Sequence, residues 1–199
     1  DIGIPADVVD QLEGPQIELL TREQMRALLQ PRAPDAHKGD FGRVVVVAGS
    51  VGKSGAAVLC GQGAMRAGAG LVTVASPQSC QPIIAAHAVE YMTEGLDETA
   101  EGTVQHSSID AVLGIDADVI VAGPGLGRGD NVRAFVRALL DKSEGPLILD
   151  ADALNAFEQE PAALVGREGR DVIITPHPGE MARLVGCTVE DLQADRIGI

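Results

Sequence analysis

Residues 43–76 read RVVVVAGSVGKSGAAVLCGQGAMRAGAGLVTVAS, and this stretch decides the fold. It opens with the apolar run Val44–Ala48, which is typical of a strand that is covered on both faces. After a glycine-containing turn, Ser54–Ala67 predicts a helix whose alanine and glycine residues allow close packing. Leu71–Ala75 predicts a second strand. A strand, a helix and a strand in this order predict a parallel βαβ unit.

The same alternation continues to the end of the chain. Further strands are predicted at Val119–Ala122, Leu147–Leu149 and Val172–Ile174. Further helices are predicted at Ser79–His87, Asn131–Leu140, Ala153–Gln159 and Glu180–Val185, and Thr188 caps one more. Right-handed crossovers place such helices on both sides of the sheet. The sequence therefore predicts an α/β fold with a three-layer, doubly wound, mainly parallel sheet.

The N-terminal residues differ from the rest. Leu19–Gln30 predicts one short helix. Thr21 is its predicted N-cap residue and forms a T-x-x-Q capping box with Gln24. The proline-containing stretch that follows ends this helix, because proline disfavours helical geometry in the residue before it. We interpret residues 1–35 as a linker or edge element, and residues 36–199 as one domain.

Composition excludes several classes of protein. The chain has 199 residues, of which 15 are basic and 29 acidic, so its net charge of −14 would repel nucleic acid. Aromatic residues make up 2%, too few to stack the bases of single strands. The sequence has no apolar run near the ~20 residues that span a bilayer, and no secretory signal opens it. The cysteines Cys60, Cys80 and Cys187 form no CxxC pair and lack metal-ligand spacing. An odd number of scattered thiols indicates a reducing compartment. We expect a cytoplasmic homo-oligomer without nucleic-acid or membrane partners.

Four predicted strands end in unusual sequences. These are GSVGKSGA at 49–56, AGPGLGRG at 122–129, LDADALN at 149–155 and TPHPGE at 175–180. In a doubly wound sheet ligands bind at the carboxyl ends of the strands. The convergence of these sequences therefore predicts a functional site at that edge of the sheet.

The first of these sequences resembles a P-loop but lacks its spacing. A Walker A loop requires a glycine five positions before Gly52, and that position is Val47, inside the predicted strand. Lys53 is therefore not expected to act as a Walker lysine. We interpret the segment as a tight turn, either purely structural or with N–H groups that face an anion or polar ligand.

The next two strand ends each allow two interpretations. Gly123–Gly127 misses the dinucleotide fingerprint, because Arg128 replaces the last glycine, but it allows a ligand to approach the backbone closely. Asp152 either caps the following helix or forms part of a functional site together with Asp150 and Asn155. Acidic groups at a strand end can hold magnesium through water.

The segment TPHPGE is the most specific of the four. Prolines on both sides of His177 fix its backbone, which favours a role for this imidazole in a site. Glu180 starts a helix, where it either interacts with the helix dipole or orients a metal-bound water. Before the first strand, His37–Asp40 is interpreted equally as a solvated turn or as a ligand-facing segment.

From about residue 36 to its end, the chain resembles the ADP-dependent NAD(P)H-hydrate dehydratases. The segments that carry the resemblance, in the family's order, are His37–Asp40 with Val44–Ser50, Ser54–Ala57, Arg66–Val72, Gly123–Gly127, Asp150–Asn155 and Thr175–Glu180. The resemblance implies a ribokinase-like fold and a carbon–oxygen lyase that repairs hydrated NADH or NADPH. With Mg²⁺, ADP or ATP would phosphorylate the ring hydroxyl, and elimination of phosphate would restore the cofactor.

The resemblance also implies roles for particular residues. Substrate contacts would fall on Ala56, Gly125 and His177. Nucleotide or phosphate would lie near Gly123, Gly127, Asp152 and Asn155, and Glu180 would act at the metal ion. His177–Glu180 is similar to the Asn-x-x-Glu segment that ribokinase-type kinases use near magnesium.

Two features depart from a lone, complete dehydratase domain. The family's Gly-Thr-Gly-Asp loop, whose aspartate is the general base, has no counterpart in these residues. We therefore expect no catalytic residue here, an incomplete fold, and a fragment that is inactive alone and truncated at its C-terminus. Asp1–Pro5 is similar to the end of the NAD(P)H-hydrate epimerase domain, which implies a bifunctional chain. The alternatives are a kinase of the same fold for a small vitamin precursor, and a non-catalytic nucleotide-binding module.

Overall fold

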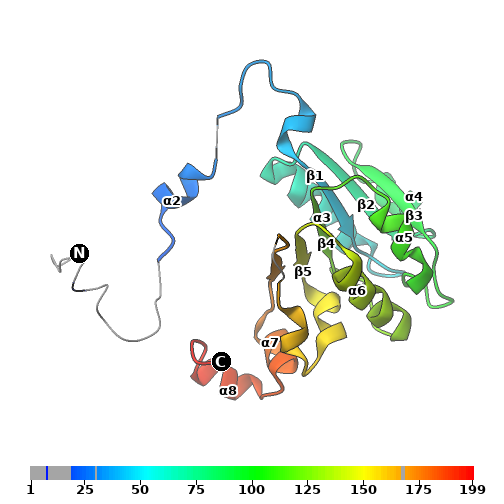
Figure 1. Cartoon of the computed structure of the whole chain (residues 1–199). Helices are drawn as coiled ribbons and strands as arrows, with labels where there is room; N and C mark the ends of the chain where they lie inside the picture. Colours follow the sequence, from blue (N-terminus) through cyan, green and yellow to red (C-terminus); the bar gives the residue numbers. More distant parts are fainter. Residues whose placement is uncertain (1–7, 9–18, 30, 167–168) are drawn as a thin grey trace. The chain divides into compact units, whose positions relative to one another are not determined.

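The computed structural model describes residues 8, 19–29, 31–166 and 169–199 (Figure 1). The chain divides into two units, Asp1–Ala36 with Gly198, and His37–Ile197 with Ile199. The first unit contains helix α2 (Arg22–Ala27), and its N-cap Thr21 forms the predicted capping box. The opening residues on which the resemblance to an epimerase rests lie outside the described residues.

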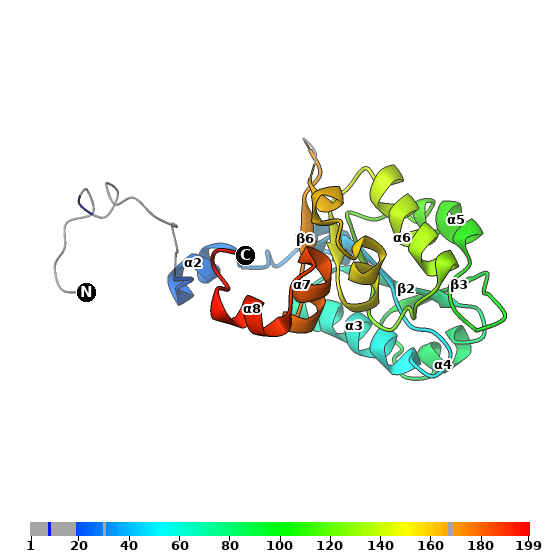
Figure 2. The same ribbon diagram turned by 90° about the horizontal axis from the view of Figure 1, so that it is seen from below.

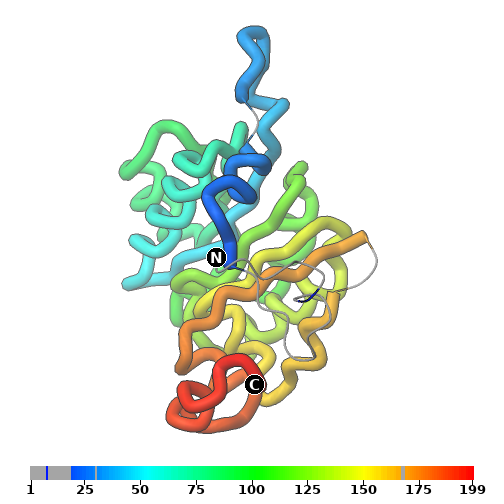
Figure 3. The backbone as a smooth tube through the Cα atoms, turned by 90° about the vertical axis from the view of Figure 1, so that its left-hand side faces the viewer, coloured from blue at the N-terminus to red at the C-terminus, as the bar shows by residue number. Residues whose placement is uncertain are grey.

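Within the described residues the second unit contains one parallel sheet of six strands, in the order β3-β2-β1-β4-β5-β6. The strands are β1 Arg43–Val47, β2 Leu71–Pro77, β3 Met92–Leu96, β4 Val119–Ala122, β5 Leu147–Leu149 and β6 Val172–Ile174. The backbone tube shows β6, in orange, beside β5, in yellow (Figure 3). The predicted α/β fold with a parallel sheet is confirmed.

Helices lie on both sides of the sheet (Figure 2). One side carries α3 (Ser54–Ala67) and α4 (Gln81–Ala85), and the other carries α5 (Ile109–Leu113) and α6 (Asp130–Lys142). The remaining elements are α7 (Pro178–Val185), α8 (Val189–Ala194) and the 3₁₀ segments η1 (Lys38–Phe41), η2 (His106–Ser108), η3 (Ala151–Phe157) and η4 (Pro161–Leu164). As predicted, Thr188 caps α8 by accepting a hydrogen bond from a backbone N–H of its first turn. Among the described residues, no helix has both the length and the apolar character needed to cross a bilayer.

The central strand β1 is buried on both faces. Val45 and Val47 belong to the core that includes Phe135 of α6. Val46 belongs to the opposite core, where it packs with Ala57 of α3. Both cores exclude water from the strand, which explains why the sequence of β1 is a continuous apolar run rather than an alternating one.

The side that carries α3 is open over part of the sheet. Val119 and Val121 of β4 and Ile148 of β5 line an apolar hollow of about 510 Å³ together with small residues of α3. Ile173 of β6 is 52% exposed. Within the described part of the chain, helices therefore cover this face only around β1, β2 and β3.

Two elements illustrate how the structure departs from the sequence prediction. The sequence pattern does not predict the edge strand β3, which reads MTEGL and is mostly exposed or half-buried, because it has no apolar run. The helix predicted at Ala153–Gln159 is the 3₁₀ segment η3, which begins and ends two residues earlier. The change in helix type matters for function, because η3 positions Asp152 and Asn155.

Candidate functional site

The strand order places a topological switch point between β1 and β4. These strands are neighbours, although the chain forms β2 and β3 before it returns to β4 on the other side of β1. Ligands of open α/β sheets bind at such a point, beyond the carboxyl ends of the strands. The loops at that edge are residues 48–53, after β1, and residues 123–129, after β4.

These two loops are joined directly by hydrogen bonds. The backbone N–H of Gly49 donates to the carbonyl of Pro124 over 2.8 Å. The buried Ser50 hydroxyl donates to the carbonyl of Gly125 over 2.7 Å. A Cβ atom added at Gly125 would lie 2.9 Å from the Cβ of Ala56. The predicted substrate residues Ala56 and Gly125 are therefore adjacent at the switch point, although 69 positions separate them in the sequence.

Asp152, in the segment after β5, forms hydrogen bonds with residues of both of these loops. Its Oδ2 accepts hydrogen bonds from the backbone N–H of Gly127 over 2.9 Å and from Lys53 Nζ over 3.1 Å. Its Oδ1 accepts a longer one from Asn155 Nδ2, over 3.4 Å. The residue at the N-cap position of η3 is Asp150, so the interpretation of Asp152 as a helix cap is wrong.

Lys53 does not form a P-loop. Val47 is a fully buried strand residue, as the failed spacing predicts. Lys53 is the N-cap residue of α3, and its ammonium group pairs with Asp152. In this arrangement the carboxylate of Asp152 occupies the position that an anion would take at the N–H of Gly127.

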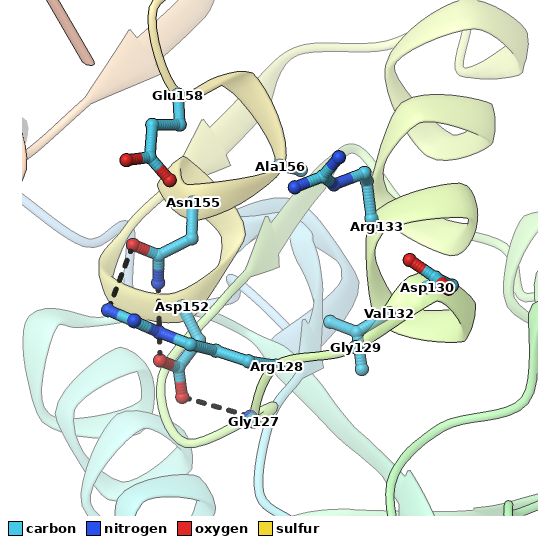
Figure 4. Close-up of a pocket in the computed structure, with 10 residues that line it drawn as sticks. All are labelled: Gly127, Arg128, Gly129, Asp130, Val132, Arg133, Asp152, Asn155, Ala156 and Glu158. Atoms are coloured by element: carbon cyan, nitrogen blue, oxygen red, sulfur yellow. Dashed lines mark hydrogen bonds between the residues drawn. The ribbon is translucent and has the colours of Figure 1, made fainter. Parts of the chain in front are cut away.

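A cavity of about 240 Å³ lies beside this network (Figure 4). Its lining residues are Gly127, Arg128, Gly129, Asp130, Val132, Arg133, Asp152, Asn155, Ala156 and Glu158. Arg128 crosses one side of the cavity and donates from Nη2 to Asn155 Oδ1 over 3.3 Å. Gly127, Asp152 and Asn155, three of the residues predicted to lie near nucleotide or phosphate, therefore all line this cavity.

His177 and Glu180 form a capping box at the start of α7. His177 Nδ1 accepts hydrogen bonds from the backbone N–H groups of Gly179, over 3.0 Å, and Glu180, over 3.4 Å. An accepting Nδ1 carries no proton, so in neutral His177 the proton is on Nε2, 3.1 Å from Glu180 Oε1. Glu180 Oε2 accepts from the backbone N–H of His177 over 2.9 Å.

The capping box is linked to the other strand ends through Asn155. Arg183 of α7 donates from Nε to Asn155 Oδ1 over 3.3 Å, so one amide oxygen accepts from both Arg183 and Arg128. The sequence predicts the residues of each strand end but not the hydrogen bonds of Asn155 with Arg183 and Arg128. Arg183 occupies an ordinary position on the polar side of a helix, and no local pattern distinguishes it from a solvated arginine.

The described residues contain no cluster of three or more His, Cys, Asp or Glu side chains that could hold a metal ion. Glu180 Oε2 accepts a hydrogen bond from the backbone N–H of His177, and Oε1 lies 3.1 Å from His177 Nε2, yet a carboxylate has further lone pairs. Glu180 can therefore still accept a hydrogen bond from a metal-bound water. Magnesium keeps several waters and binds through substrate phosphates, so the residues present are compatible with it.

The pKa values of two cysteine thiols, Cys60 and Cys80, are raised. Burial, and then the negative charge of Asp150, raise the pKa of the Cys60 thiol. Burial also raises the pKa of Cys80, although a hydrogen bond with Ser79 acts in the opposite direction. The reactive form of cysteine is the thiolate. Both groups therefore remain thiols near neutral pH.

His177 has a structural role that can be separated from binding. We expect His177→Ala to lower the free energy of unfolding by about 1 kcal/mol, the usual effect of losing an N-cap. His177→Ser should retain the stability, because serine also caps α7. Urea denaturation measures both changes. Equal losses for the two variants would show that stability depends on the imidazole rather than on the cap.

The fold class is a doubly wound parallel sheet with four strand-end loops joined at the switch point. This is the ribokinase-like arrangement, and the chain superimposes on a ribokinase-like superfamily protein of Enterococcus faecalis with a TM-score of 0.70 and 24% identity. Residues 44–199 match the NAD(P)H-hydrate dehydratase family, to which this chain belongs.

Relatives of known name agree with this assignment. The bifunctional NAD(P)H-hydrate repair enzyme Nnr of Moorella thermoacetica is 42% identical over 201 residues, which cover 100% of this chain and 38% of that protein. The ADP-dependent (S)-NAD(P)H-hydrate dehydratase of Xanthomonas campestris is 35% identical, over 92% of this chain and 63% of that protein. The chain therefore spans less than two thirds of the length of these relatives.

A solved structure gives the same result. The ADP/ATP-dependent NAD(P)H-hydrate dehydratase of Bacillus subtilis, co-crystallised with ATP and Mg²⁺, matches with a TM-score of 0.71 and 35% identity. The match covers 88% of this chain and 58% of that one. The expected family and the expected ribokinase-like fold are both confirmed.

Proposed function

We propose that the joined strand-end loops form the substrate side of an NAD(P)H-hydrate dehydratase, which restores NADH or NADPH from its hydrated form. The observation that carries the proposal is the contact of Gly125 with Ala56 at the switch point. Both residues lack a bulky side chain, so a large planar ligand can approach the backbone there. His177 lies at the end of β6, at the same edge of the sheet.

Each candidate residue has a definite task in this proposal. The backbone around Gly125, with Ala56 beside it, supports the hydrated ring and its ribose. The side chain of His177 is 63% exposed while its Nδ1 caps α7, so a ligand can contact the ring without breaking the cap. Gly123, Gly127, Asp152 and Asn155 surround the phosphate groups. Glu180 orients a magnesium-bound water.

The chemistry removes water in two steps. The ring hydroxyl loses its proton to a general base and forms a bond to the terminal phosphorus of ADP or ATP. The bond from that phosphorus to its bridging oxygen breaks, and AMP or ADP leaves. The phosphorylated ring then loses phosphate and a proton from the adjacent carbon, which restores the double bond. Bound nucleotide and Mg²⁺ supply the phosphoryl group and neutralise its charge. The chain positions the hydroxyl and contributes backbone donors.

None of these residues is assigned the role of general base in this proposal. The 199 residues contain no Gly-Thr-Gly-Asp sequence, and the carboxylate of Asp152 is engaged with Lys53 and Gly127. General-base catalysis contributes about 10²–10⁴-fold. We therefore expect this chain to bind hydrated NADH and to turn it over only at the background rate.

Two measurements on the 199-residue chain test the proposal. Calorimetric titration compares hydrated NADH with NADH, and recovery of the near-ultraviolet absorbance of the reduced ring is followed with nucleotide and Mg²⁺. Tighter binding of the hydrated form without turnover supports the proposal in full. Turnover would support the function but show that a residue present here, such as Asp152 or Glu180, acts as the base. Absence of any binding would overturn the function.

A further inference from the structure

The 3₁₀ segment η3 lies between two residues with a strained backbone. Ala151, its first residue, has a φ angle of +52°, and Gln159, two residues after its end, has a φ angle of +60°. Among the residues that the structure describes, these two are the non-glycine residues with positive φ. Such conformations cost free energy and persist only where the surrounding structure holds them in place. The position of η3 therefore depends on contacts with other elements.

Arg137 of α6 makes such contacts at the C-terminal end of η3. Its Nε donates a hydrogen bond to the carbonyl of Ala156 over 3.0 Å. Its Nη2 pairs with Glu160 Oε1 over 2.8 Å, and its guanidinium carbon lies 5.3 Å from the ring centroid of the buried Phe157. One guanidinium group thus forms a hydrogen bond, an ion pair and a cation–π contact with the end of η3 and the turn that follows it.

These contacts join two sides of the cavity beside Asp152. Asp130 and Arg133, in the first turn of α6, line one side of this cavity, and Asp152 and Ala156 of η3 line another (Figure 4). Arg137 lies one helical turn after Arg133, and the carbonyl that it binds belongs to Ala156. The side chain of Arg137 therefore sets how far η3 lies from α6.

The position of η3 in turn affects the loop after β4. Asp152 lies in the first turn of η3, and its Oδ2 accepts a hydrogen bond from the backbone N–H of Gly127 over 2.9 Å. Gly125 belongs to the same loop as Gly127, and its backbone is the proposed support of the hydrated ring. A displacement of η3 would lengthen the hydrogen bond between Asp152 and Gly127 or would move this loop.

We propose that Arg137 is a positioning residue for substrate binding, which acts through η3 and Asp152 on the loop that supports the hydrated ring. This inference rests on the proposed function. The hydrogen bond, the ion pair and the ring contact of Arg137 all go to the region of residues 156–160, so its effect on the ligand is indirect. Lysine would not replace it fully, because an ammonium group lacks the planar fork that donates to two acceptors and stacks on a ring.

The test compares Arg137→Met with Lys142→Met. Methionine retains an apolar chain at position 137 but removes the hydrogen bond, the ion pair and the cation–π contact. Lys142 lies on the same helix and pairs with Asp110 over 3.3 Å, so its substitution removes an ion pair that does not involve η3. Thermal denaturation identifies a temperature at which all variants are folded, and calorimetric titration with hydrated NADH is performed there. The amide signal of Gly127 in the ligand-free chain, labelled with nitrogen-15, reports its hydrogen bond with Asp152.

We expect Arg137→Met to shift the Gly127 signal and to weaken binding of hydrated NADH about tenfold, which is within the range of couplings that act through intermediate residues. Lys142→Met should change neither. In an Asp152→Ala chain, the further substitution Arg137→Met should leave the affinity unchanged, because the residue through which Arg137 acts is absent. Arg137→Lys should show both changes to a smaller extent, and it decides the question if Arg137→Met does not fold.

A purely structural role would lower the melting temperature without changing the affinity of the folded chain. An unchanged Gly127 signal, an unchanged affinity, or losses that add in the double variant would therefore overturn the inference and leave the proposed function intact. A wild-type chain that binds no hydrated NADH would overturn the proposed function, and the inference with it.

Discussion

Gly123→Ala is expected to lower the free energy of unfolding by more than about 4 kcal/mol, a range that few single substitutions reach. A Cβ atom at this position would lie 1.7 Å from the carbonyl oxygen of Asp150, so the loops after β4 and β5 would have to separate. The φ angle of Gly123 is +136°, a conformation that other residues rarely adopt. Chemical denaturation of the variant measures the loss.

Gly129→Ala is the matched control for this effect. Gly129 has a similar φ of +138°, but a Cβ atom there would meet nothing within 4 Å. Its substitution should cost only the conformational strain, about 1–3 kcal/mol. If the two variants lose the same stability, backbone strain alone explains the glycine at 123, and the close approach of the two loops has no energetic role.

Asp152→Ala is expected to lower the free energy of unfolding by about 2–3 kcal/mol and to weaken binding of hydrated NADH. The substitution removes the acceptor of the buried Gly127 N–H, and an unsatisfied buried donor costs about 1–3 kcal/mol. It also removes the ion pair with Lys53, which is half exposed and contributes about 0–1 kcal/mol. Calorimetry and denaturation are performed on the same samples.

Lys53→Met and Asp152→Asn separate these two contributions. Lys53→Met removes the ion pair but leaves the acceptor of Gly127 in place, so its cost should stay below about 1 kcal/mol. Asp152→Asn removes the charge but retains an oxygen that can accept from Gly127, and it should behave like Lys53→Met. A loss from Lys53→Met as large as that from Asp152→Ala would show that the ion pair, rather than the loop contact, dominates.

Much of the fold follows from local sequence pattern. The run Val44–Ala48 predicts β1 to within one residue, and α3 begins and ends at the predicted positions. Both elements are central and pack on apolar neighbours, so β1 is a continuous apolar run and α3 is rich in alanine and glycine. The edge strand β3 has a polar, glycine-containing sequence because less of it is buried, and periodicity therefore does not reveal it.

The location of the candidate site follows from the sequence, but its internal connections do not. Strand-end motifs share an edge because parallel strands point the same way, and this geometry brings Ala56 beside Gly125. The partner of Asp152 depends on tertiary contacts with Lys53 and Gly127. From its sequence position alone, Asp152 could be interpreted as a helix cap. Only the fold shows that it accepts a hydrogen bond from Gly127 in the loop after β4.

The central claim is that hydrated cofactor binds at the carboxyl-terminal edge of the sheet, and amide chemical-shift mapping tests it directly. The 20.6 kDa chain is labelled with nitrogen-15 and titrated with hydrated NADPH. We predict that the amide signals of Ala56, Gly125 and Gly179 shift in a saturable manner. The signals of Asp116 and Gly145, which line a hollow at the opposite edge, should remain unchanged. Shifts confined to that opposite edge, with Ala56 and Gly125 unaffected, would contradict the account.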